Sequence, residues 1–256
     1  MRAGDLGRAI GLALRALDSG YADPVLFNLR AHWRKHNGRP TDALADLERA
    51  LELDPRSPPI LTGIADCLNT LGHHKKALAA ADGALVLEPA LAAAWYQKAL
   101  AHQMLNDIDA AKAAYLEAVR HDPGMADALS RLAALCAQQG DSANARTYAD
   151  RALVLRPGHD VAHLAHIALD LAEGRQEAAE ARIQSLLANR QVAPLTRAIA
   201  LSHLGDLRDR QRRADEAFAA YREAGHVWTS VYGTRFARPD QESVPQMLDR
   251  LTAAFS

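Results

Sequence analysis

Three histidines in the run HDVAHLAH have a spacing that could serve metal chemistry. His159, His163 and His166 stand about one helical turn apart, and neutral imidazoles on one face of a helix can share a metal ion. However, His163 and His166 occupy positions that in a helical repeat normally point into the core. No set of carboxylates accompanies them in the sequence. We therefore expect a structural role for these histidines and no metal site.

The other chemically active groups are sparse. Only two cysteines occur, Cys67 and Cys136, and neither has a second cysteine or a histidine cluster nearby, which argues against a disulfide framework or a zinc site. Cys136 falls at a predicted core position. The motifs GxxxxGK[ST], GxGxxG after a strand, GxSxG and HExxH are all missing from the sequence. We expect no catalytic, cofactor-binding or metal-binding residues, and a reducing, cytoplasmic setting.

Charge and composition exclude further classes of function. The 30 basic and 31 acidic residues give a net charge of −1, so the chain lacks the basic field that nucleic acid or an anionic membrane requires. No stretch approaches the roughly 20 apolar residues of a membrane span. Arg208, Arg210, Arg212 and Arg213 alternate with aspartates, so we interpret them as a solvated helix end with intrahelical ion pairs. Abundant Ala and Leu, with only 5% aromatic residues, favour helices throughout.

The elements that must position any site are set by a 34-residue period. Alanine, glycine and proline recur at fixed places in successive units, with Asn106 standing where the turn glycine is missing. Small residues allow helices to approach closely, glycine and asparagine tolerate a left-handed turn, and proline ends a helix. The recurring residues are Ala31, Ala65, Ala99 and Ala133; Ala43, Ala77, Ala111 and Ala145; Ala50, Ala84, Ala118 and Ala152; Gly38, Gly72 and Gly140; and Pro55, Pro89, Pro123 and Pro157.

This pattern resembles the tetratricopeptide repeat (TPR) family, whose unit is a helix–turn–helix. The third unit, AAAWYQKALAHQMLNDIDAAKAAYLEAVRHDP, carries Trp95, Ala99, Tyr115, Ala118 and Pro123 in the roles that the family pattern assigns. The resemblance implies an all-α fold, a right-handed superhelical solenoid of antiparallel helix pairs with a C-terminal capping helix. It also implies that stability comes from stacking neighbouring units.

The period predicts the following organisation. An N-terminal capping half-repeat covers 1–23, a repeat array covers 24–231, and a tail with a helix covers 232–256. The array divides into units at 24–57, 58–91, 92–125, 126–159, 160–197 and 198–231. The unit 160–197 is degenerate, because Pro194 stands three residues after the place of the closing proline. We expect its second helix or the following linker to be about four residues longer than usual.

In such a stack the first helices of the units line a concave groove, which the resemblance implies is the binding surface. The amides there are suited to a ligand backbone, and Tyr96 and Leu100 are expected to be exposed between them. The chain is therefore predicted to be a scaffold that binds a peptide or protein. The groove candidates are Asn28, His32, Lys35, Thr62, Asp66, Asn69, Tyr96, Leu100, Gln103, Ser130 and Asp206. His32 replaces an asparagine of the subclass that clamps acidic chaperone tails, which disfavours that ligand.

The C-terminal segment suggests an alternative. The stretch from Ala217 to Ser256 is similar to the junction of bacterial TPR–sulfotransferase fusion proteins, which implies a substrate-recognition module whose catalytic domain is absent from this chain. Val244, Met247, Leu248, Leu251 and Phe255 fall on one side of a predicted terminal helix. In a stand-alone scaffold that face caps the solenoid, and in a module part of it docks a catalytic domain. A homo-oligomer is also compatible with exposed solenoid ends.

Overall fold

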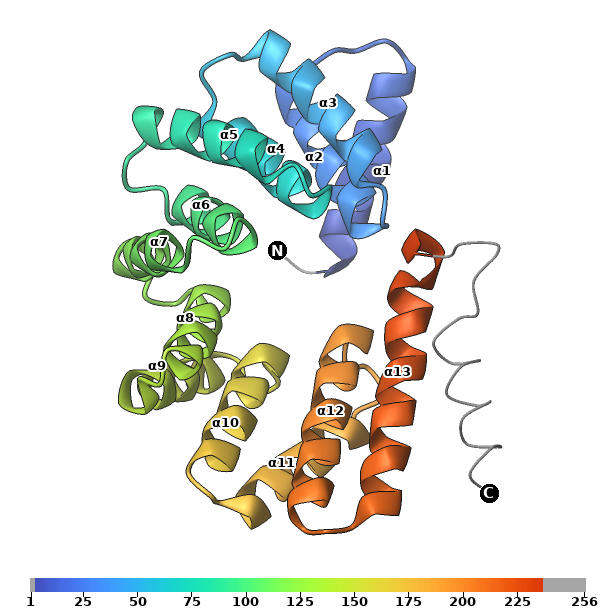
Figure 1. Ribbon diagram of the computed structural model, residues 1–256. Coiled ribbons are helices and arrows are strands. Elements are labelled where there is room, and N and C mark those ends of the chain that lie inside the picture. Colours follow the sequence, from blue (N-terminus) through green and yellow to red (C-terminus); the bar gives the residue numbers. More distant parts are fainter. Residues whose placement is uncertain (1–2, 237–256) are drawn as a thin grey trace. The chain divides into compact units, whose positions relative to one another are not determined.

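The computed structural model describes residues 3–236, which form thirteen α-helices (Figure 1). Within this range the structure has no strand, which confirms the all-helical prediction. The helices are α1 (Ala3–Asp18), α2 (Pro24–His36), α3 (Pro40–Leu53), α4 (Pro58–Thr70), α5 (His74–Leu87), α6 (Ala92–Met104), α7 (Ile108–His121), α8 (Ala126–Gln138), α9 (Ser142–Leu155), α10 (Asp160–Ala172), α11 (Gln176–Ala188), α12 (Pro194–Arg210) and α13 (Ala214–Phe236). None of these helices is both long and apolar enough to cross a membrane.

The C-terminal part of the prediction lies mostly beyond the described range. The predicted capping helix, with Val244, Met247, Leu248, Leu251 and Phe255, falls outside the described residues. At residue 232, where the tail is predicted to begin, α13 continues as a helix as far as Phe236. The repeat boundaries themselves stay a prediction.

The chain divides into two compact units, residues 1–128 and residues 129–256. In the first unit α1 packs against α2, and the pairs α2–α3, α4–α5 and α6–α7 follow, with α4 also in contact with α2 and α6. Helix α8 begins at the end of the first unit and runs into the second. In the second unit α10 contacts α9, α11 and α12, and α13 lies along α12.

The recurring alanines form the closest contacts between helices. All twelve alanines of the three registers, from Ala31 to Ala152, are between 0% and 1% exposed. A methyl side chain lets two helix backbones approach closely, so each of these positions admits no larger residue without displacement. The predicted core positions of Tyr115 and Cys136 are also confirmed, since both are fully buried.

We predict that Ala77→Leu will lower the free energy of unfolding by about 1–3 kcal/mol, because three extra carbons must enter a filled contact. Ala79→Leu, on the exposed side of the same helix α5, is the matched control and should change it by less than about 0.5 kcal/mol. Urea unfolding of both variants measures the difference. If both variants were destabilised equally, the buried face of α5 would not be the one that contains Ala77.

The turns inside the helix pairs share one left-handed residue. Gly38, Gly72 and Gly140 have φ between 72° and 81°, and Asn106 has φ 62°, as the sequence predicts. Gly174, with φ 75°, takes the same place between α10 and α11. The sixth turn uses Arg212, with φ 59°, which the sequence analysis missed. A left-handed conformation costs a residue with a Cβ roughly 1–2 kcal/mol. Arg212 adopts it because the helices on either side hold the turn in place.

The prolines end the units by restricting the residue before them. Helices α3, α5, α7 and α9 each end two residues before a repeat proline. The intervening residues Asp54, Glu88, Asp122 and Arg156 have extended backbones, with φ between −142° and −134° and ψ between 82° and 93°. A proline disfavours helical backbone in the residue before it, so the helix stops there.

The four extra residues near Pro194 lie elsewhere than predicted. Helix α11 has 13 residues, no more than its counterparts, and α12 has 17 residues where the earlier first helices have 13. Pro194 is tolerated at the start of α12, because its missing N–H would have no helical partner there. The extension is therefore about one helical turn of the first helix, which keeps its buried face in phase.

Candidate partner-binding site

The first-helix face is defined here as the nine groove candidates of the first unit, which lie on α2, α4 and α6. They are Asn28, His32, Lys35, Thr62, Asp66, Asn69, Tyr96, Leu100 and Gln103. Two interactions join the helices at this face. Lys35 of α2 forms an ion pair with Asp66 of α4, with both side chains 32% exposed. The Asn69 Nδ2 of α4 donates to two acceptors of Gln97 on α6, the backbone carbonyl oxygen at 2.9 Å and the side-chain Oε1 at 3.1 Å.

Several of these polar groups are thus already bonded within the chain. The Asn69 Oδ1 lies 3.4 Å from Nδ1 of His74, and the Gln103 Oε1 accepts a hydrogen bond from the Tyr115 hydroxyl at 2.8 Å. The expectation that these amides are open to a ligand backbone needs correction. Asn69 and Gln103 hold neighbouring helices together, which sequence register alone does not reveal.

Two candidates remain open at the surface. His32 is exposed and Asn28 is half-buried, and neither side chain has a hydrogen bond to a described residue. Tyr96 and Leu100 are half-buried and so less exposed than predicted, because the Tyr96 ring packs 5.7 Å from the Tyr115 ring. Thr62 is buried and its hydroxyl donates to the Pro58 carbonyl, which removes it from the accessible face.

The two candidates of the second unit differ from each other. Ser130 is 1% exposed, with its Oγ 3.4 Å from Nε2 of His159, so its predicted place in an open groove is wrong. Asp206 is exposed and accepts a hydrogen bond from the Tyr221 hydroxyl at 2.7 Å. That bond raises the pKa of Tyr221 to about 12, because it stabilises the protonated phenol.

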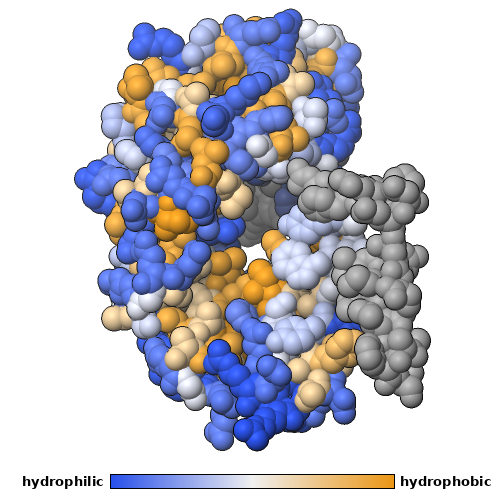
Figure 2. Space-filling view, in the orientation of Figure 1, coloured by the Kyte–Doolittle hydropathy of each residue, from blue (hydrophilic) through white to orange (hydrophobic). Residues whose placement is uncertain are grey.

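The exposed apolar side chains outside the first-helix face are scattered. Val86 and Val154 are 81% and 83% exposed on the second helices α5 and α9. On the face shown in Figure 2, hydrophobic and hydrophilic residues are interspersed over the first unit. Single exposed apolar residues are ordinary on protein surfaces and do not define a second binding face.

The three histidines of HDVAHLAH have separate partners. The His166 ring is buried in the core, as predicted, and its Nε2 lies 2.9 Å from the Asp150 Oδ1. His163 was expected in the core but is half-buried, and its Nε2 donates to the Pro157 carbonyl at 2.9 Å.

The cysteine Cys67 is buried, and burial raises the pKa of its thiol to about 11. A thiol with this pKa is a poor nucleophile.

Charged side chains lock the helices of the second unit. Arg146 of α9 reaches Asp170 of α10 at 3.4 Å, and Arg208 of α12 holds Glu180 of α11 through two hydrogen bonds of 2.5 and 2.9 Å. The side chain of Arg208 is only 10% exposed. The interpretation of this arginine as part of a solvated helix end is therefore wrong, because its main partner lies on another helix. Arg213, by contrast, stands just before α13 and pairs with Glu216 in the first turn of that helix.

These ion pairs occupy equivalent repeat positions with opposite polarity. Arg146 and Glu180 are one repeat length apart on second helices, and each pairs with position 11 of the next repeat unit, counted from residue 160 or 198. That position holds Asp170 in one pair and Arg208 in the other. The charges are also exchanged between two helix pairs, one from each unit. In α2–α3 the first helix carries the basic residue, Arg34, which pairs with Asp46. In α10–α11 the first helix carries the acidic residue, Asp170, which pairs with Arg182.

Reversing one charge at the α11–α12 contact should be costly. Glu180→Arg or Arg208→Glu alone places like charges together, and we expect a loss of about 3–5 kcal/mol in the free energy of unfolding. The double reversal should restore part of it, because position 208 would still face Glu216, which lies 3.2 Å from Arg208. Arg120→Glu, in the exposed pair with Glu117, is the control and should cost less than about 1 kcal/mol. Additive single effects in this double-mutant cycle would argue against the pairing.

Burial of His166 predicts a pH-dependent stability. Desolvation lowers the pKa of His166, the neighbouring Arg182 and Arg146 lower it further, and Asp150 and Asp170 oppose them. The unfolded chain therefore takes up a proton near pH 6.5 that the folded chain resists. The free energy of unfolding should fall as the pH drops below 6.5, by up to about 1.4 kcal/mol per pH unit for this one proton.

His166→Gln should flatten that pH dependence between pH 7.5 and 5.5 in urea unfolding experiments, because it removes the titrating ring. His32→Gln, which replaces an exposed histidine, should leave it unchanged. A pH dependence that persists in His166→Gln would assign the effect to another group, such as His203, whose pKa burial also lowers.

The fold and this site define a class of protein: an array of antiparallel helix pairs, stacked through small residues. Two family models of the tetratricopeptide repeat match the chain, over residues 36–102 and 96–160. Residues 36–160 therefore belong to the tetratricopeptide repeat family. A comparison with curated protein sequences gave no significant match.

Solved structures share this fold. PilW, a widely conserved type IV pilus biogenesis factor, is 19% identical, with a TM-score of 0.66 over 88% of this chain and 98% of that one. TTC0263, a TPR protein of Thermus thermophilus, is 21% identical, with a TM-score of 0.61 over 71% and 98%. YrrB, a TPR protein with an unusual peptide-binding site, is 20% identical, with a TM-score of 0.53 over 82% and 98%. At these identities the likeness concerns the fold alone.

Proposed function

We propose that this chain is a protein-interaction scaffold, and that the first-helix face of the first unit binds a segment of a partner polypeptide. Tetratricopeptide repeats generally mediate protein–protein interactions and are typically non-catalytic. The peptide-binding site of the structurally similar YrrB is compatible with such a role. The cytoplasmic location and a homo-oligomeric state stay predictions.

The observation that carries the proposal is the contrast between fixed and open groups on this face. The Lys35–Asp66 ion pair and the bonds from Asn69 to Gln97 hold α2, α4 and α6 in place. On that held surface, Asn28 and His32 keep their hydrogen-bonding capacity. A rigid surface with open polar groups binds at a lower entropic cost than one that must be ordered first.

The ligand that this face suits is an extended or helical segment with an apolar side chain. Half-buried Tyr96 and Leu100 offer apolar contact on α6, and Asn28 and His32 offer hydrogen bonds on α2. An aromatic or aliphatic anchor beside polar contacts is the usual basis of peptide recognition.

A displayed library of random peptides, selected on the purified chain, tests this face. We expect the selected peptides to bind Asn28→Ala/His32→Glu about ten-fold more weakly, the effect of losing one or two contacts. His73→Glu, an exposed histidine at the start of α5, is the control and should stay within about two-fold. Unchanged binding to the double variant, or a selection that yields no peptide, would contradict the proposal.

The sulfotransferase-module alternative gains no observation from the described residues. Part of the segment that carries the resemblance forms α13, and residues 237–256 lie outside the described range. It stays a prediction, which sequencing the gene beyond the codon for Ser256 would test. A continuing frame with a phosphosulfate-binding loop would support it, and a stop codon would remove it.

A further inference from the structure

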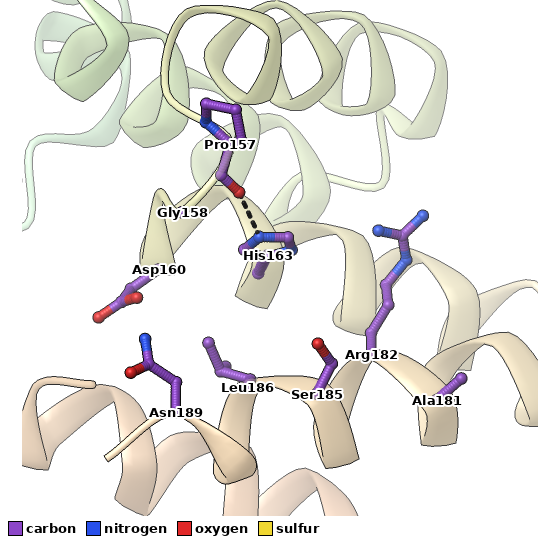
Figure 3. Close-up of a pocket in the computed structure, with 9 residues that line it drawn as sticks. All are labelled: Pro157, Gly158, Asp160, His163, Ala181, Arg182, Ser185, Leu186 and Asn189. Atoms are coloured by element: carbon purple, nitrogen blue, oxygen red, sulfur yellow. Dashed lines mark hydrogen bonds between the residues drawn. The ribbon is translucent and has the colours of Figure 1, made fainter. Parts of the chain in front are cut away.

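A cleft of about 450 Å³ lies within the second unit, on helices other than those of the first-helix face. Its walls are the loop before α10, the first turn of α10 and the C-terminal half of α11 (Figure 3). The residues that line it are Pro157, Gly158, Asp160, His163, Ala181, Arg182, Ser185, Leu186 and Asn189. Its size is sufficient for a long side chain.

The cleft is lined mainly by apolar atoms, but it also carries polar side chains that the equivalent region of the first unit lacks. Three repeat lengths earlier, Leu61 of α4 packs toward α5, so that a Cβ at Gly83 would lie 3.7 Å from the Leu61 Cδ1. Leu61 also belongs to a cluster with Ala84 and Trp95. In α10–α11 the corresponding positions carry polar groups, with Asp160 for Pro58, His163 for Leu61, Ser185 for Gly83 and Asn189 for Leu87. Of these four, His163 stands at a position that is large and apolar in every other unit, with Phe27, Leu61, Trp95, Leu129 and Leu201. A polar residue at such a position points to a function.

His163 is held in one orientation. Its Nε2 lies 2.9 Å from the Pro157 carbonyl, and a carbonyl only accepts, so Nε2 carries the hydrogen. Trp95, two repeat lengths earlier, makes the same contact, since its indole N–H donates to the Pro89 carbonyl at 2.8 Å. The Nδ1 atom of the neutral His163 ring is therefore left as an acceptor.

The remaining polar groups are mainly acceptors and carry one negative charge. The Asp160 Oδ2 accepts the Ala193 N–H at 3.3 Å, which leaves its Oδ1 without a described partner. The Ser185 hydroxyl has no hydrogen bond to a described residue. Asn189 accepts the Gln191 N–H at 3.0 Å through Oδ1 and keeps its amide donor. A ligand that satisfies this set must bring several N–H donors and a positive charge.

The one arginine in the lining points to another partner. The Arg182 Nε donates to the buried Asp170 at 3.1 Å, a carboxylate that Arg146 and Arg175 also contact. Glu173 is the second acid of this group, so Arg182 keeps part of its positive charge. Figure 3 shows the Arg182 side chain at the opposite end of the row from Asp160 and Asn189. A cationic group is therefore placed at the end of the cleft near Asp160, where this carboxylate offsets the positive end of the α10 helix dipole.

We propose that this cleft binds the side chain of a lysine or arginine from a partner polypeptide. The cationic head lies at Asp160, with Ser185 and Asn189 beside it, and the aliphatic stem lies along Leu186, Ala181 and Pro157. This is a second site. It rests on the partner being a polypeptide, as proposed above, but not on the first-helix face, so each site can fail without the other.

The test uses the full chain, labelled with ¹⁵N, and the capped pentapeptide Ac-Ala-Ala-Lys-Ala-Ala-NH₂. Amide shifts at 158–163 and 181–193 should move in a saturable way. The same peptide with an acetylated lysine, which keeps the stem and loses the charge, should bind about ten-fold more weakly. Equal binding of the acetylated peptide, or preferential binding of a glutamate version, would overturn the proposal. Binding of n-butylamine as tight as that of the peptide would overturn the polypeptide source.

Two variants locate the contact. Asp160→Asn keeps the shape and the hydrogen bond to Ala193 but removes the charge, and should weaken binding about ten-fold. Glu177→Gln removes another first-turn acid, that of α11, outside the cleft, and should stay within about two-fold. Equal loss in both variants would attribute the binding to general electrostatics and overturn the site. His73→Glu and Asn28→Ala/His32→Glu should both bind this peptide normally, which separates the test from that of the first-helix face.

Discussion

The structure depends on how closely neighbouring helices approach at the recurring alanines. A helix pair of this length does not bury enough apolar surface to fold alone, so its stability is shared with the pairs before and after it. Alanine at the contact brings backbones within range of many weak dispersion contacts at no cost in side-chain entropy. The first helices can therefore present long side chains on one face, because the opposite face is filled by methyl groups.

Polar interactions refine this packing. In the first unit, Lys35, Asp66 and Asn69 tie three first helices together at the face proposed to bind a partner. In the second unit, buried Asp170 and Arg208 connect helices through paired charges. A buried ion pair adds little net stability compared with an apolar contact of the same volume, but it penalises any arrangement in which its partner is absent. The charges therefore specify which helices meet more than they strengthen the contact.

Much of the fold was predictable from the sequence because its main determinants are local. Backbone limits at Gly72 and Pro89 and the small volume of Ala77 act within one unit and repeat with its period. The features that were missed depend on neighbours. Arg212 adopts a left-handed turn that its own preference opposes, and Pro194 starts a helix whose added turn is visible only once both helix ends are known.

The candidate site was predictable only in part, for the same reason. Register placed Asn69 and Gln103 on the correct helices, but their hydrogen bonds to Gln97 and Tyr115 depend on the distance to the next helix. Ser130 occupies the same repeat position as half-buried Tyr96 and is nevertheless buried beside His159. A repeat position thus defines a direction from the helix axis, whereas accessibility depends on the side chains opposite it.

The alternating polarity of the ion pairs has a consequence for the history of the gene. Repeat arrays commonly grow and shrink by whole units through unequal recombination. Loss of the segment that encodes α10 and α11 would bring Arg146 against Arg208, and its duplication would bring Glu180 against a second Asp170. Either event would bury like charges at the new junction. This part of the chain should therefore keep a fixed number of units while other parts of the array are free to vary in length.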